Sequence, residues 1–97
     1  MPTREPQADL PGADLVARGI ADLRAGRESE ESLLAAMAAT RLRRVGLAVP
    51  DTSVEHPEHR LYALLAARDD RSAHSRYNAL VGRLASFARA AEHARAR

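Results

Sequence analysis

Histidine is the residue type that most readily does acid–base or metal chemistry near neutral pH, and this 97-residue chain contains four. His56 and His59 lie close together in the sequence His-Pro-Glu-His. A structural zinc ion needs about four ligands that converge tetrahedrally. This histidine pair supplies at most two ligands, with a proline between them, so the sequence predicts neither a metal site nor a bound cofactor.

Arg68 and His74 form a second candidate, because the histidine follows the arginine by six positions at a predicted junction of two helices. Four polar residues and Ala73 separate them, and Tyr77 follows shortly after. This pattern resembles the catalytic motif of the HEPN superfamily, small helical proteins of which many are ribonucleases in toxin systems. The resemblance implies that Arg68 stabilises a phosphate and that His74 acts on the ribose hydroxyl or the leaving group. In the simpler interpretation, Arg68 balances the negative end of one helix and His74 is an exposed residue of the next.

Arginine side chains supply a third candidate. Arg41 falls within the apolar face of a predicted helix, where a guanidinium must extend to water, pair with an acid or meet a partner. Its place near the helix end favours extension to water. The arginines that could meet phosphate or an acidic partner are Arg41, Arg43, Arg44, Arg76, Arg83 and Arg97. Against a nucleic-acid partner stand the net charge of only +2 and the 3% content of aromatic residues.

The composition narrows the class of protein. All 15 basic residues are arginine, which together with the many alanines indicates the codon usage of a high-GC genome. The absence of cysteine excludes a disulfide framework and a thiolate metal site. The sequence shows no signal-peptide pattern and no run of about 20 apolar residues, so we expect no membrane association and a cytoplasmic location.

The elements that must position these residues are predicted to be helices, because alanine and leucine dominate the apolar content. Residues 1–12 are rich in proline and are expected to form a flexible N-terminal arm, followed by a single helical domain over residues 13–97. Four helices are predicted, over about residues 13–25, 30–45, 57–68 and 70–95. Their expected end signals are Gly26, Ser29, Gly46 and Pro57.

Short connections predict that consecutive helices pair antiparallel. The fold class is therefore all-α, a compact four-helix arrangement of two antiparallel hairpins in which the fourth helix is longest. Leu80 and Leu84 lie on the apolar stripe of that helix and are expected at the centre of the core. Gly19 lies inside the first helix and is expected to mark close packing against a neighbour.

The length of the fourth helix also predicts self-association. At 1.5 Å per residue it extends about 35–40 Å, whereas the first and third helices reach about 18 Å. An overhanging end would carry Phe87, Ala88 and Ala91, an apolar patch that two copies could bury in a homodimer. In the rival arrangement, Phe87 is covered by the second helix and the chain is monomeric.

The leading hypothesis is a small non-enzymatic helical module that binds a protein partner or itself. An apolar patch along Tyr62, Tyr77 and the last helix would indicate this function. The alternatives are a nucleic-acid-associated regulator that uses an arginine surface, and a HEPN-like ribonuclease or toxin–antitoxin component. The candidate partner-binding residues are Arg41, Arg43, Arg44, Tyr62, Tyr77, Arg83 and Phe87.

Overall fold

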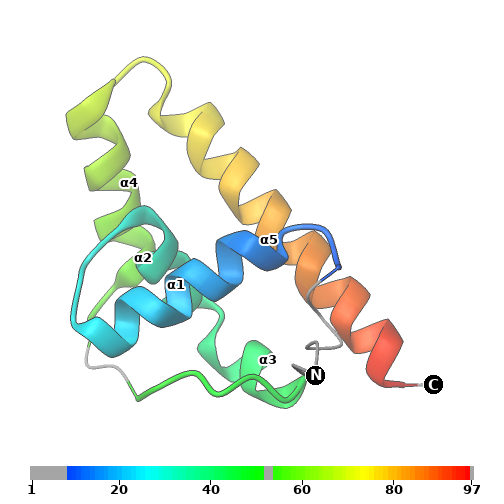
Figure 1. Ribbon diagram of the computed structural model, residues 1–97. Helices are drawn as coiled ribbons and strands as arrows, with labels where there is room; N and C mark the ends of the chain where they lie inside the picture. The colour runs from blue at the N-terminus through cyan, green and yellow to red at the C-terminus, as the bar shows by residue number, and fades with distance from the viewer. Residues whose placement is uncertain (1–8, 52–53, 97) are drawn as a thin grey trace.

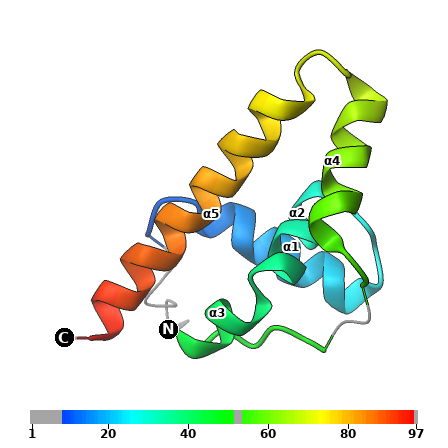
Figure 2. The ribbon, with the colours of Figure 1, turned by 180° about the vertical axis from the view of Figure 1, so that it is seen from behind.

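Five helices form the described part of the computed structural model, which comprises residues 9–51 and 54–96. They are α1 (Ala13–Ala25), α2 (Glu30–Met37), α3 (Ala39–Arg44), α4 (Pro57–Arg68) and α5 (Ala73–Arg95). No strand occurs in these residues, so the predicted all-α class is confirmed. Figure 1 shows α4 and α5 joined by a tight turn and diverging from it, with α1 and α2 between their open ends. The reverse view shows α3 below α1 and α2, toward the C-terminal half of α5 (Figure 2).

The helix ends follow the signals in the sequence. Gly26 and Gly46, predicted to close helices, have left-handed φ angles of 72° and 91°. Ser29 begins α2 with a capping box: its Oγ accepts from the Ser32 N–H at 3.0 Å, and the Ser32 Oγ accepts from the Ser29 N–H at 2.8 Å. Pro57 is the first residue of α4, where a missing N–H breaks no intrahelical bond.

The helix predicted over residues 30–45 is interrupted at Ala38, so five helices are present instead of four. Ala38 has a φ of −104° and a ψ of 13°, and neither proline nor glycine marks this position. Four consecutive residues of α2 are buried, namely Ser32, Leu33, Leu34 and Ala35. In contrast, α3 buries a narrower stripe that contains Leu42. We infer that the break turns this stripe toward the core, so that tertiary packing overrides local helix propensity.

Close contact between α1 and α2 depends on Gly19. A Cβ atom placed on Gly19 would overlap the carbonyl oxygen of Glu31 and would lie 3.1 Å from the Cβ of Ala35. Only glycine lets the two helix backbones come this close. The expectation that Gly19 marks close packing is confirmed.

Leucines from every helix and one phenylalanine form the core. The largest fully buried side chains are Phe87, Leu33, Leu34, Leu42, Leu61, Leu65 and Val45. Leu84 is 7% exposed and belongs to the core, as predicted. Leu80 is only half-buried, so the expectation that it lies at the core centre is wrong. Helical periodicity placed Leu80 on the apolar face of α5, but it did not show how completely other segments cover that position.

The chain that enters α1 lies against α5. Residues 1–8 of the predicted arm fall outside the described residues, but Leu10 packs against the core and Gly12 precedes α1 with a φ of 79°. A Cβ atom on Gly12 would lie 3.1 Å from the carbonyl oxygen of Arg83 and 3.4 Å from the Cβ of Phe87. The folded part of the chain therefore begins before Ala13.

The predicted overhang at the end of α5 is wrong. Phe87, Ala88 and Ala91 are each 1% exposed. The chain that enters α1 lies over Phe87, and α3 is tied to the last turns of α5 by an ion pair described below. Helix lengths alone do not reveal these two coverings. The apolar surface assigned to a homodimer contact is therefore inside the chain.

Candidate functional site

Tyr62 on α4 and Tyr77 on α5 form an aromatic surface near the turn that joins the two helices. Their ring centroids lie 5.7 Å apart, and the ring planes are inclined by 56°. Tyr62 is 39% exposed, which makes it the one large apolar side chain that is exposed among the described residues. Tyr77 is half-buried and packs against the core. The short connection between α4 and α5 thus brings together both tyrosines that the sequence singled out.

Smaller apolar side chains continue this surface along both helices. Residues four apart lie on the same face of a helix. Ala66 follows Tyr62 at this spacing, Val81 and Ala85 follow Tyr77, and all three are half-buried. We call the resulting set the tyrosine face: Tyr62, Ala66, Tyr77, Val81 and Ala85.

Arg41 reaches the surface, as expected, and there it meets an acid. Its Nε donates to the Oε2 of Glu92 at 2.7 Å, and its Nη2 donates to Oε1 at 2.9 Å. Two parallel hydrogen bonds of this kind fix the orientation of both side chains. The pair joins α3 to the last turns of α5.

The charges around Glu92 favour its ionised form. The hydrogen bond from Arg41 lowers the pKa of Glu92 below its ordinary value, and the positive charges of Arg41, Arg44 and Arg89 act in the same direction. Partial loss of hydration acts in the opposite direction and is outweighed. The sequence reasoning did not identify Glu92, although a signal was present, because Glu92 is the only acid after Asp70.

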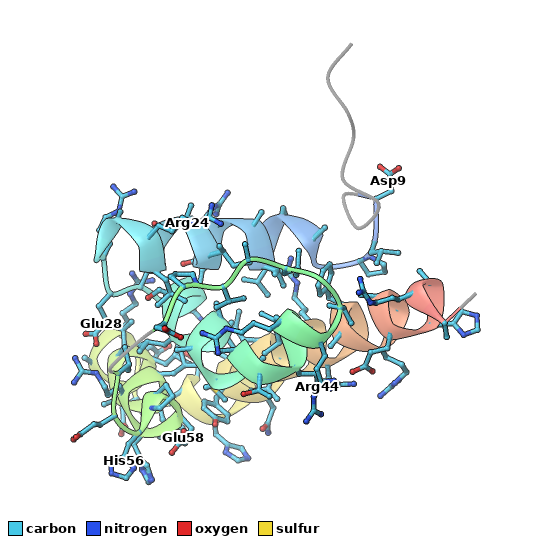
Figure 3. The ribbon with its side chains drawn as sticks, turned by 90° about the horizontal axis from the view of Figure 1, so that it is seen from below. Asp9, Arg24, Glu28, Arg44, His56 and Glu58 are labelled. Atoms are coloured by element: carbon cyan, nitrogen blue, oxygen red, sulfur yellow. The ribbon has the colours of Figure 1, made fainter. Side chains whose placement is uncertain are left out.

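Arg43 and Arg44 are both exposed, as predicted, but they differ in what they contact. The Nε of Arg43 donates to the carbonyl oxygen of Val49 at 3.0 Å, and its Nη2 donates to that of Pro50 at 2.9 Å. Arg43 therefore holds the connection that follows α3. Arg44 points outward from the end of α3 (Figure 3).

The arginines of α5 also contact acids of their own chain. The Nη2 of Arg76 lies 3.4 Å from the Oε1 of Glu30, and the Nη2 of Arg83 lies 3.7 Å from the Oδ1 of Asp14. Arg97 lies outside the described residues. A phosphate-binding surface built from the predicted arginines would have to compete with these contacts and with those of Arg41 and Arg43.

Arg68 and His74 make separate contacts. The Nη1 of Arg68 donates to the Oε2 of Glu30 at 2.6 Å, which ties the end of α4 to the start of α2. The Nε2 of His74 lies 3.2 Å from the Nδ2 of Asn78, one turn along α5. No hydrogen bond or ion pair joins Arg68 to His74 within the described chain.

A third potential ligand accompanies the histidine pair at the start of α4. The Nδ1 of His56 lies 4.0 Å from the Oε1 of Glu58. One ligand atom from each of His56, Glu58 and His59 falls within a group whose members are all within 4.8 Å of one another. The sequence reasoning counted the two histidines but not Glu58, which lies between them in the chain.

Comparisons with known proteins identify no relative. No family model matches the chain, and neither a curated protein nor a solved structure matches it. Among the described residues, no helix has both the length and the apolar content needed to cross a bilayer. Function is therefore inferred from the geometry of the side chains.

Proposed function

We propose that this protein is a non-enzymatic helical interaction module that binds a protein partner through the tyrosine face. The observation that carries the proposal is the contact between the exposed ring of Tyr62 and Tyr77. Tyrosine is enriched among the residues that contribute most to protein interfaces, since it offers a large rigid apolar area and a hydroxyl group. Neither ring is needed to fill the centre of the core, where leucines and Phe87 are fully buried.

The shape of the tyrosine face suits an α-helical partner. From Tyr77 to Ala85 the face follows α5 for about 12 Å, or two helical turns. Amphipathic partner helices are commonly recognised by apolar anchors at this spacing. The partial burial of the apolar side chains Ala66, Tyr77 and Val81 supports this assignment, because part of each remains open to a partner.

Contacts within the chain favour this function over its two alternatives. The arginines Arg41, Arg43, Arg76 and Arg83 contact acids or carbonyl oxygens of the same chain, which reduces their availability for nucleic acid. Arg68 pairs with Glu30, which reduces its availability for the phosphate chemistry of a HEPN-like ribonuclease. The ring of Tyr62, in contrast, contacts Tyr77 and still remains 39% exposed.

Site-specific photo-crosslinking tests the proposal. A photoreactive phenylalanine analogue replaces Tyr62 in one variant and Ala21 in the control, because Ala21 is exposed on α1, which packs on α2 and α5. In the native cell, position 62 should form a discrete adduct with one protein, and position 21 should not. An adduct with a second copy of the chain would make the partner the protein itself. Equal, diffuse labelling from both positions would reject the tyrosine face as the binding surface.

A further inference from the structure

His56 has an unusual backbone conformation at the start of α4. Its φ of 49° and ψ of 55° make it the only residue other than glycine with a positive φ in the described chain. A residue before proline is normally extended, and a left-handed conformation is uncommon for a side chain of this size. This conformation places His56 as the N-cap of α4, directly before Pro57 and the pair Glu58 and His59.

The result is a cluster of three side chains that carry potential metal ligands at the start of α4, of which Figure 3 labels His56 and Glu58. The two imidazole rings meet edge to face, with centroids 5.8 Å apart. The carboxylate of Glu58 lies 4.0 Å from the Nδ1 of His56, and all three ligand atoms lie within 4.8 Å of one another. Ligand atoms on one tetrahedral zinc ion lie about 3.3 Å apart, so small rotations of these exposed side chains would bring them into range.

Neighbouring groups leave the cluster available. No hydrogen bond from the rest of the described chain reaches the side chains of His56, Glu58 or His59. The guanidinium of Arg60, the next residue along α4, pairs with Glu28, whose Oε1 accepts from its Nε at 2.6 Å. The positive end of α4 opposes a bound cation, and the charge of Glu58 offsets that effect.

We propose that His56, Glu58 and His59 bind a divalent transition-metal ion, with water completing its coordination. Two imidazoles and one carboxylate suit Zn²⁺ and similar ions, whereas Mg²⁺ and Ca²⁺ prefer oxygen ligands alone. This site goes beyond the proposed function and does not depend on it, because metal binding is measured with the purified chain and no protein partner.

Calorimetric titration of the full chain with Zn²⁺ at about pH 7.5 tests the site. We expect saturable binding of one ion per chain. His56→Gly removes one ligand but tolerates the left-handed backbone, and His59→Ala removes another. Each change should weaken binding at least about tenfold, since even the loss of groups that only support metal ligands costs about that much. His74→Ala is the matched control and should bind as the unmodified chain does.

Lower pH provides a second readout. Protons compete with a metal ion for the imidazole nitrogens, so the affinity should fall steeply as the pH is lowered to about 5. An excess of Mg²⁺ should not displace Zn²⁺. The proposal is overturned if the unmodified chain shows no saturation below about 1 mM Zn²⁺. Unchanged affinity in a folded variant that carries both His56→Gly and His59→Ala would overturn it as well.

Discussion

Arg41 on α3 and Glu92 on α5 are 51 positions apart in the sequence and meet in a two-point ion pair at 2.7 and 2.9 Å. The pair fixes the short helix α3 against the C-terminal half of α5. It also accounts for an arginine on the apolar face of α3, because the guanidinium finds its acid at the edge of the core. Both side chains remain partly exposed, so water weakens the attraction between them.

The first prediction concerns the pH dependence of this pair. The pKa of Glu92 is lower in the folded chain than in the unfolded chain, where a glutamate has a pKa of about 4.3. The pair therefore stabilises the fold above that pH, and the stabilisation is lost as the pH falls through the lowered pKa. The difference in urea midpoint between the unmodified chain and Glu92→Gln should be present at neutral pH and should vanish in acid. Glu55→Gln, an exposed change of the same charge, should show no such trend; a difference independent of pH would contradict the assignment.

Two glycines in helices should respond oppositely to alanine. Gly19→Ala should destabilise the fold by about 1–3 kcal/mol or more, because its methyl group would overlap the carbonyl oxygen of Glu31. Gly82→Ala should stabilise it by about 0.5–1 kcal/mol, because nothing lies within 4 Å of the added atom and alanine favours the helix. Chemical denaturation measures both. If Gly19→Ala is neutral, the close approach of α1 and α2 is incorrect.

Phe87 should behave as a core residue. Phe87→Ala should lower the free energy of unfolding by about 3–5 kcal/mol, since the ring is 1% exposed. Leu80→Ala should lower the free energy of unfolding clearly less than Leu84→Ala does, because Leu84 lies deeper in the core than Leu80. Equilibrium unfolding of the three variants gives the order. If a Phe87→Asp variant instead folds with unchanged stability, Phe87 is exposed at the end of α5 and its assignment to the core is wrong.

Two adjacent arginines provide a matched test of the connection after α3. Arg43→Ala removes hydrogen bonds to the carbonyl oxygens of Val49 and Pro50 and should cost about 0.5–1.5 kcal/mol. Arg44→Ala removes the same charge from an exposed neighbour and should change stability by less than about 0.5 kcal/mol. Thermal unfolding compares them directly. Equal losses would mean that Arg43 acts only through its charge.

Local signals in the sequence predicted the helix ends well. Ser29 and Pro57 act through bonds within a few residues, so their effect does not depend on the rest of the fold. The break at Ala38 has no such signal, since neither proline nor glycine marks it and it is evident only in the different sets of residues that α2 and α3 bury. Local periodicity therefore predicted one continuous helix over residues 30–45, where the structure has α2 and α3.

Long-range contacts limited the prediction of the candidate sites. The burial of Phe87 depends on the chain around Gly12, and the role of Arg41 depends on Glu92. Helical periodicity places each residue on a face but does not say which distant segment covers that face. The contact between Tyr62 and Tyr77 was more accessible, because one short turn joins their helices.

The affinity of the Tyr62→Ala variant for the protein crosslinked from position 62 tests the central claim most directly. Circular dichroism should first show an unchanged fold, because Tyr62 is exposed and lies outside the fully buried core. Calorimetry should then show binding at least about tenfold weaker than that of the unmodified chain, as for the loss of an interface hot spot. Ala21→Ser on the exposed surface of α1 should leave the affinity unchanged. A folded Tyr62→Ala variant that binds within about twofold of the unmodified chain would contradict the assignment of the tyrosine face as the binding surface.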